Sequence, residues 1–374
     1  MPQKTSTQNR LFFLDHIRIF LCIMVIMLHT AITYGANGGW FHKEVANADV
    51  SPLMQLVYQI FNTVTQAYSM GFFFLIAGYF TAPSLIKKGT LEFLKDKLIR
   101  LGIPLALFAT ILAPLTIGLA RLMQEGGTLL DGVHWIWGMG HYQCGPLWFV
   151  QTLLIFSLIY ALWKAISPKK ESKASHLPSH LSLLIAGILV GLVAFTFRLK
   201  IPVGENVFGM QLGYFASYIA LFFVGCRAYH DHWLEKISFK YALPWAIVSL
   251  ISIMLLPMLA KSCSDGSLFN GGWNIYAFMY AMWEPFAAWG IILLILYITR
   301  RFLSGTTPFF SGLARCSYAV YVIHPPVLVG LTLLSHNWVA APGIKWLVVG
   351  LMTCIACWGI AAIMIKLPGL RRVF

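Results

Sequence analysis

The sequence predicts an all-α, polytopic membrane protein, a bundle of about ten transmembrane helices. Hydrophobic residues make up 59% of the chain and charged residues only 11%, whereas a soluble domain carries about 25% charged residues. The chain also contains ten long apolar stretches, and its lysines and arginines alternate between rich and poor connecting segments. A soluble fold of this length would spread its charges through its helices, so this composition disfavours that class.

The ten apolar stretches are each close to the roughly 20 residues that a helix needs to cross the hydrocarbon core. They lie at residues 17–34, 56–82, 101–120, 146–166, 181–199, 212–229, 241–260, 274–299, 316–335 and 344–365. We expect them to form one integral membrane domain spanning residues 1–374, with no extramembrane domain. The longest polar stretch, residues 167–180, is rich in Ser, Lys and Pro and predicts a solvated cytoplasmic linker.

The positions of the basic residues predict the orientation. With the N-terminus in the cytoplasm, all but six of the 27 Lys and Arg residues fall on the cytoplasmic side, as the positive-inside rule requires. The six on the outer side are Lys43, Arg121, Arg198, Lys200, Lys261 and Lys345. Both termini are therefore expected in the cytoplasm. The net charge of +14 reflects this topology, and basic residues divided among short loops predict no nucleic-acid surface.

The seven cysteines predict neither a disulfide framework nor a metal site. Their number is odd and most lie inside the apolar stretches. Cys354 and Cys357 form a C-x-x-C pattern on an apolar helix with no histidine nearby, which favours packing over metal binding. Cys144 and Cys263 lie in or near outer loops, and the sequence leaves open whether they pair.

The first predicted helix carries three ionisable residues, Asp15, Arg18 and His29. Charged groups inside a membrane are costly and are functional candidates by default. At 100° per residue, Arg18 and His29 lie about 20° apart and Asp15 within about 60° of both, so all three share one face. A rise of about 16 Å places His29 toward the outer half of the bilayer. On this reasoning a catalytic role and a structural role are equally well supported. In the structural alternative, Asp15 and Arg18 form a local ion pair and His29 bridges two helices.

Outer segments hold aromatic residues with two possible roles. Residues 35–50 include Trp40, and residues 121–145 include Trp135 and Trp137. Aromatic side chains at this level are usually anchors at the membrane interface. Stacking on a sugar is the alternative.

Five motifs follow one another in a fixed order along nearly the whole chain. They are R-x-x-x-L-D-x-x-R at residues 10–18 with His29 eleven residues on, FFFLIAGYF at 72–80, K-x-x-R-L-x-x-P at 97–104, LWFV at 147–150 and S-Y-x-x-Y-x-x-H-x-P at 317–326. Together they resemble the acyltransferase 3 family of integral membrane O-acyltransferases. Three positions depart from the family pattern: Ile19 replaces a glycine, Ala77 a serine, and Lys97 an arginine. The G-Y-F ending at 78–80 and the R-L-G-I-P run at 100–104 are similar to the branch that succinylates periplasmic glucans.

The resemblance implies an enzyme that moves an acyl group, acetyl or succinyl, from cytoplasmic acyl-coenzyme A to a hydroxyl of an extracytoplasmic glycan or other carbohydrate. It implies a bacterial cytoplasmic membrane, contact with membrane lipid, and no permanently bound cofactor, because coenzyme A serves as a substrate. His29 would be the general base, since a neutral imidazole can take a proton from a hydroxyl. Arg18 and Asp15 would support the donor path. Arg100 and Lys97 would bind the anionic end of coenzyme A, or else serve as ordinary positive-inside anchors.

Three further residues are candidates with structural alternatives. Glu284, in the middle of a span, would orient an imidazolium or bind the acceptor, or else hydrogen-bond a neighbouring helix. His324 would contact substrate, or else cap a helix that is broken at Pro325. Trp148 would contact substrate, or else pack against its neighbours. A transporter or permease for a glycan or anion is the rival function, and a non-catalytic sensor a second one. A transporter would need acidic relay residues in several helices, and here only Glu284 qualifies clearly.

Overall fold

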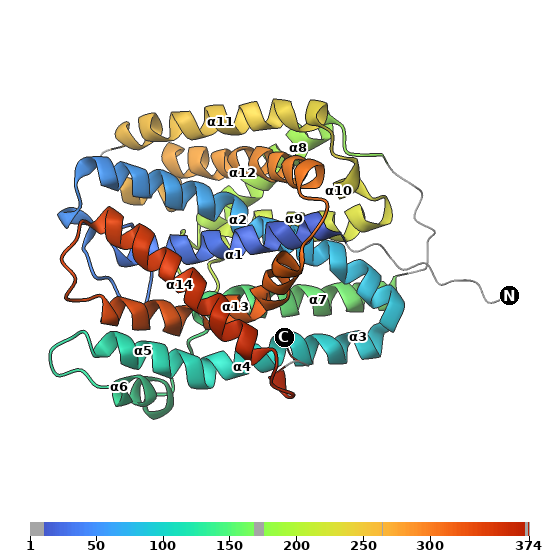
Figure 1. Cartoon of the computed structure of the whole chain (residues 1–374). Helices are drawn as coiled ribbons and strands as arrows, with labels where there is room; N and C mark the ends of the chain where they lie inside the picture. The colour runs from blue at the N-terminus through green and yellow to red at the C-terminus, as the bar shows by residue number, and fades with distance from the viewer. Residues whose placement is uncertain (1–10, 168–175, 264, 371–372, 374) are drawn as a thin grey trace.

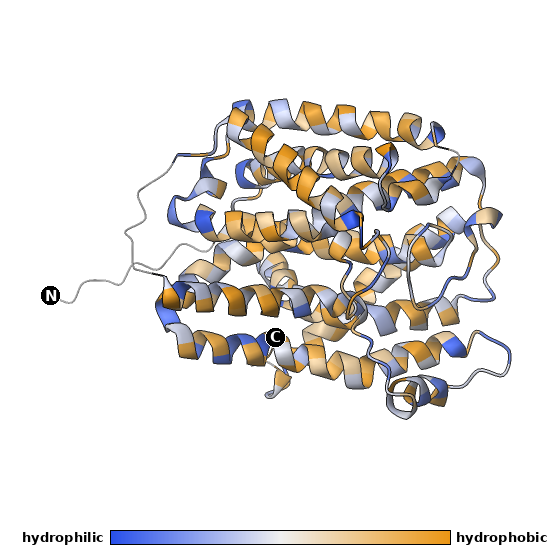
Figure 2. Cartoon of the chain, turned by 180° about the vertical axis from the view of Figure 1, so that it is seen from behind, coloured by the Kyte–Doolittle hydropathy of each residue, from blue (hydrophilic) through white to orange (hydrophobic). Residues whose placement is uncertain are grey.

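The computed structural model describes residues 11–167, 176–263, 265–370 and 373. These residues fold into helices that lie side by side in one bundle, with no β-strand among them (Figure 1). Ten helical segments are long and apolar enough to cross a membrane. Figure 2 shows hydrophobic residues along the sides of these helices and hydrophilic ones concentrated at their ends and in the loops. The predicted all-α membrane bundle is confirmed.

Each of the ten spanning segments overlaps one predicted apolar stretch, and several begin earlier or end later than it does. They are α1 (Phe12–Thr33), α2 (Pro52–Lys88), the run of α3 to α5 (Thr90–Arg121), η5 with α7 (Gly145–Ile166), α8 (His180–Arg198), η6 with α9 (Leu212–His230), α11 (Phe239–Lys261), α12 (Ile275–Phe302), α13 (Pro308–Leu334) and α14 (Pro342–Met364). The third segment begins eleven residues before the predicted boundary because the charged stretch that precedes it is also helical. The predicted linker at 167–180 lies largely outside the described residues.

The third span is built of short pieces. It consists of α3 (Thr90–Lys97), α4 (Ile103–Leu107) and α5 (Ala113–Arg121), joined by the π-helical turns η2 (Leu98–Gly102) and η3 (Phe108–Leu112). Pro104 has no N–H and cannot bond the carbonyl of Arg100 in the α-helical pattern. The hydroxyl of Tyr318 on α13 donates to that carbonyl instead, at 2.7 Å. The carbonyl that Pro104 leaves free in one motif is thereby hydrogen-bonded to Tyr318 in another motif.

The remaining short helices lie in connecting segments. They are η1 (Asn47–Asp49), α6 (Leu130–Val133), η4 (His134–Gly138), α10 (Trp233–Lys236) and η7 (Gly266–Phe269). One of them, α6, folds back along α5 (Figure 1). The segment 121–145 is therefore partly helical, where the sequence predicted only a connection.

Glycines let two helices approach closely near the centre of the bundle. A Cβ placed at Gly78 of α2 would lie 2.1 Å from the carbonyl oxygen of Phe222 on α9, and one at Gly225 would lie 2.1 Å from that of Leu75. Small residues at such crossings are a common way to pack helices in membranes. α1 packs against α2, α12, α13 and α14, and its ionisable residues Asp15, Arg18 and His29 are all partly buried.

Candidate active site

α1 carries two of the candidate groups near its beginning and the third near its end. Asp15 and Arg18 form an ion pair at 3.5 Å, the local i,i+3 pair that the sequence gave as an alternative to a catalytic role. His29 lies eleven residues beyond Arg18, one turn before the helix ends at Thr33. The structure therefore separates a charged pair near the beginning of α1 from an imidazole near its end.

His29 and His324 come together from opposite ends of the sequence. Nδ1 of His29 lies 3.1 Å from Nε2 of His324, and the two rings are within 12° of parallel. His324 is completely buried, whereas His29 keeps partial exposure. α13 places His324 against α1 because its helix continues unbroken through Pro325 and Pro326. The sequence proposed both histidines separately, and the structure pairs them.

Pro325 determines how His324 is protonated. Without an N–H, Pro325 cannot bond the carbonyl of Tyr321 four residues earlier. Nδ1 of His324 lies 2.7 Å from that carbonyl oxygen, which can only accept a hydrogen bond. Nδ1 of His324 therefore carries the proton, and in a neutral ring Nε2 must be an acceptor.

The tautomer of His324 determines that of His29. Because Nε2 of His324 accepts, Nδ1 of His29 must donate, and Nε2 of His29 keeps its lone pair. A ring held in this tautomer can take a proton at Nε2, and the resulting imidazolium still donates from Nδ1 to His324. The pair can thus do the work of a general base whose orientation is fixed by a second group.

Trp40 covers the pair from the loop between α1 and α2. Its ring stacks on His29 with centroids 4.1 Å apart and planes 15° apart, and lies 6.0 Å from the ring of His324. The sequence offered Trp40 only as an interface anchor or a sugar platform. The sequence held one sign that Trp40 could contact His29: it lies in the loop that follows the helix of His29.

Glu284 lies in a different cluster. It forms an ion pair with Arg198 of α8, and Arg198 also donates from Nε to the carbonyl of Gly213 at 3.0 Å. The rings of Tyr214 and Tyr280 lie 5.3 and 4.9 Å from the Arg198 guanidinium carbon. Arg198 is fully buried as the last residue of α8. The ion pair of Glu284 is with Arg198, rather than with the histidine pair.

Arg100 and Lys97 lie in the first half of the third span, where α3 passes into η2. Nε of Arg100 is 3.2 Å from Asp96, and 60% of the Arg100 side chain is exposed. Lys97 lies over the ring of Phe93, with Nζ 5.3 Å from its centroid. Arg100 is thus the exposed cation of the two, beside Asp96, whereas Lys97 is only partly exposed. The hydroxyl of Tyr318 connects the backbone of Arg100 to α13, the helix that carries His324.

Trp148 begins α7 and packs in the bundle. Its ring stacks on Tyr218 with centroids 5.5 Å apart and lies 6.5 Å from Phe74. These neighbours match the packing alternative given for this residue. Cys144 and Cys263, whose pairing the sequence left open, are both free thiols.

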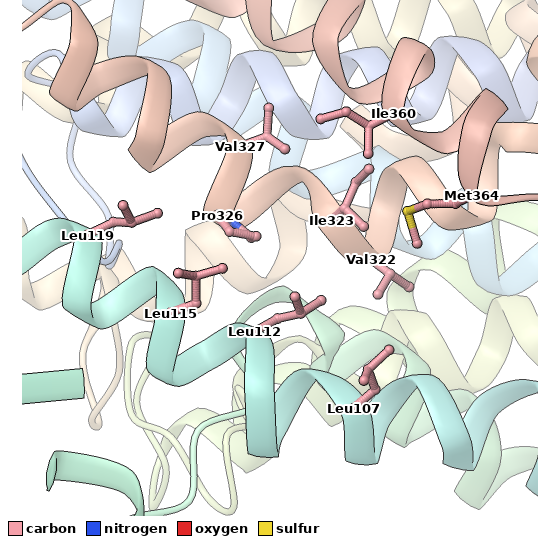
Figure 3. A pocket seen from close by; sticks show the side chains of 10 residues that line it. All are labelled: Leu107, Leu112, Leu115, Leu119, Val322, Ile323, Pro326, Val327, Ile360 and Met364. Atoms are coloured by element: carbon pink, nitrogen blue, oxygen red, sulfur yellow. The ribbon is translucent and has the colours of Figure 1, made fainter. Parts of the chain in front are cut away.

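An apolar groove of about 370 Å³ borders α13 on another side (Figure 3). It is lined by Leu107, Leu112, Leu115, Leu119, Val322, Ile323, Pro326, Val327, Ile360 and Met364. The groove lies between α13, the α4–α5 run and α14. Neither histidine of the pair lines it, and no ionisable side chain does either, so this groove is not the candidate catalytic site.

A helical membrane bundle with an oriented histidine pair is suited to proton transfer inside the membrane. Residues 11–362 match the family model described as an acyltransferase domain. The chain therefore belongs to the acyltransferase 3 family and is an integral membrane acyltransferase. Family membership decides in favour of an enzyme over the transporter alternative.

One curated relative is glucans biosynthesis protein C of Salmonella gallinarum, which is 24% identical over 194 residues. The aligned stretch covers 50% of this chain and 48% of the relative, so the match spans about half the length of that protein. No solved structure matches the chain.

Proposed function

We propose that this protein transfers an acyl group from acyl-coenzyme A to a hydroxyl of an extracytoplasmic carbohydrate, with Nε2 of His29 as the general base. The observation that carries the proposal is the hydrogen-bond chain from His29 through His324 to the Tyr321 carbonyl. It leaves one basic nitrogen on a ring whose orientation is fixed. The name of the relative, a glucan biosynthesis protein, supports a glucan as the acceptor.

The reaction proceeds in two balanced steps. The acceptor hydroxyl oxygen attacks the thioester carbonyl carbon while its proton moves to Nε2 of His29. The tetrahedral intermediate then breaks its C–S bond, the new ester is released, and the coenzyme A thiolate takes the proton back from His29. His324 supports the imidazolium in between because its Nε2 accepts from Nδ1 of His29, and His324 keeps its own proton on Nδ1 throughout.

The donor enters from the basic inner end in this proposal. Arg100 and Lys97 bind coenzyme A phosphates there, Arg100 with the fork that suits a phosphate and Lys97 as a point charge. Arg18, with Asp15, lies at the inner end of the helix that carries His29, about 16 Å below it. The acyl arm would follow α1 and α13 outward to the histidine pair. This arrangement needs a cytoplasmic membrane with both termini inside.

The test is acyl transfer by purified protein in detergent. Acetyl- and succinyl-coenzyme A are offered as donors with a gluco-oligosaccharide as acceptor, and the product is identified by mass spectrometry. We expect His29→Ala and His29→Gln to lose activity by about 10²–10⁴-fold, the usual contribution of general acid–base catalysis. Both variants should remain folded, because each can still pack in the same space.

The glutamine variant separates the two roles of His29. An amide can replace the hydrogen bond to His324 but cannot accept the proton. If His29→Gln retained near-normal turnover, His29 would be a bridge between helices and the proposed mechanism would be wrong. His230→Gln is the matched control, since His230 is an exposed histidine at the end of α9 and should keep full activity.

A further inference from the structure

The outer loop that carries Trp40 is fixed to the bundle along its length. We call residues 35–50 the strap. The amide of Asn47, near its end, donates to the carbonyl of Gly35 at its beginning, at 2.6 Å, and closes the strap on itself. The backbone N–H of Glu44 donates to the carbonyl of Thr33 at 2.8 Å. A Cβ placed at Gly145, just before α7, would lie 2.9 Å from the ring of Phe41. The strap is therefore closed down over the outer end of α1.

Glu44 joins the strap to the far side of the site. Its carboxylate accepts hydrogen bonds from His42 at 3.2 Å and from His336 at 3.0 Å, and lies 3.5 Å from Nζ of Lys345. His336 follows α13 and Lys345 lies in the first turn of α14. Only 6% of the Glu44 side chain is exposed. One carboxylate thus connects the strap to the two helices that flank the site.

The charge state of Glu44 favours this contact. Burial opposes ionisation of the carboxylate, but the hydrogen bonds from His336 and His42 and the charges of His336 and Lys345 outweigh it, so the pKa lies below the usual glutamate value. The ring of Tyr34, at the end of α1, lies 5.8 Å from Nζ of Lys345 on the same side. Glu44 is therefore ionised at neutral pH, when the enzyme would work.

Trp40 is the residue that this connection holds in place. It lies between Gly35 and Glu44 in the strap, and its indole face covers His29. The indole Nε1 is buried and has no hydrogen-bond partner among the described residues. Since Nε1 makes no bond that would fix Trp40, its position depends on stacking and on the strap.

We propose that Trp40 is a positioning residue for His29, and that Glu44 is the latch that holds Trp40 against the ring. The inference rests on the proposed function, because it needs His29 to be the base. Stacking holds the imidazole plane so that Nε2 stays aimed at the acceptor. When His29 takes the proton, the negative face of the indole also stabilises the imidazolium, and tryptophan does this better than other aromatic rings.

The first experiment separates chemistry from binding. We expect Trp40→Leu to lower kcat by about 2- to 30-fold, the range that a cation–π contact supplies. KM for the donor and for a gluco-oligosaccharide should stay within about twofold of wild type, since no substrate contact is lost. Trp40→Phe keeps a ring and should recover part of the loss. A raised acceptor KM with unchanged kcat would overturn the proposal, because Trp40 would then be a platform for the sugar.

The second experiment tests whether Glu44 acts through Trp40. Glu44→Gln keeps the shape but removes the charge, and we expect a smaller fall in kcat. In a double-mutant cycle, Glu44→Gln should add almost nothing to Trp40→Leu, because the latch then has nothing to hold. Additive losses would contradict the latch. The matched control is Asp49→Asn, which removes an exposed carboxylate from the same strap and should leave kcat unchanged.

A third measurement does not depend on activity. Hydrogen exchange followed by mass spectrometry should show faster exchange across residues 35–50 in Glu44→Gln than in wild type or Asp49→Asn. Unchanged exchange in Glu44→Gln would reject the latch even if acyl transfer by wild type were confirmed. Faster exchange together with an active His29→Gln would instead keep the latch and reject the proposed function, and with it the role of Trp40 as a support for the base.

Discussion

At the scale of single residues, the geometry of the site depends on the absence of a backbone N–H at Pro325. Pro325 has no N–H to offer the Tyr321 carbonyl, and Nδ1 of His324 takes the vacant acceptor. The same device occurs at Pro104, where the vacant carbonyl of Arg100 receives the hydroxyl of Tyr318. In both places a proline in the middle of a helix frees a carbonyl, and a side chain from one of the sequence motifs occupies it.

This reasoning predicts the effect of Pro325→Ala. The new N–H would compete with His324 for the Tyr321 carbonyl, so the proton on His324 would no longer be held at Nδ1. We expect kcat to fall by about 2- to 10-fold, the value of one ordinary hydrogen bond, while thermal stability in detergent is unchanged or higher. Pro326→Ala is the control, because its vacant carbonyl belongs to Val322. An equal fall in both variants would indicate a change of helix shape instead of a change in proton position.

At the scale of secondary-structure elements, α8 is held to α12 by a charge pair inside the membrane. Arg198 and Glu284 are both buried, with exposed fractions of 0% and 1%. Removing one member of such a pair leaves an uncompensated charge, whereas replacing both with apolar residues of similar size is often tolerated. The pair thus serves the packing of two helices that are otherwise joined by apolar contacts.

We therefore expect Glu284→Ala and Arg198→Ala each to destabilise the folded protein by about 3–5 kcal/mol. The double replacement Arg198→Met with Glu284→Met should recover most of that loss. Thermal melting in detergent, with the fraction of folded protein measured by gel filtration, checks both outcomes. A Glu284→Ala protein that melted like wild type but was inactive would return Glu284 to the chemistry.

At the scale of the whole molecule, the orientation predicted from the charges would place His29 toward the outer side and the proposed donor site at the inner side. The distribution of Lys and Arg predicts that both termini lie in the cytoplasm. Two of the six cations that the sequence assigns to the outer side are buried in ion pairs, Arg198 with Glu284 and Lys345 with Glu44. They are partly neutralised, so the outer side is even less positive than the sequence count indicates.

Reporter fusions check this orientation. A reporter placed after residue 170 or after residue 372 should be active in the cytoplasm, and one inserted within residues 35–50 should be active outside. The strap would then lie on the side of the membrane from which the carbohydrate approaches. A C-terminus found outside would contradict the proposed orientation and the donor path through Arg100.

The sequence by itself determined the ten spans, the polytopic class and the family. These are properties of local windows: about 20 apolar residues are enough to make a helix partition into the bilayer, and short motifs keep their spacing along the chain. It also singled out His29, Arg18 and Arg100, because an ionisable residue in or beside an apolar helix stands out from its neighbours. The approximate ends of the helices were less well predicted, since charged turns such as 90–97 continue a helix without being apolar.

Only the tertiary structure decided which of these residues act together. His29 and His324 are 295 positions apart, and Arg198 and Glu284 are 86 apart, so no periodicity within one helix relates them. Whether they meet depends on how α1 crosses α13 and how α8 crosses α12, which is fixed by packing over the whole bundle. Trp40 is the clearest case: an outer-loop tryptophan is ordinary in sequence, and only the fold of residues 35–50, latched by Glu44, brings its ring onto the base.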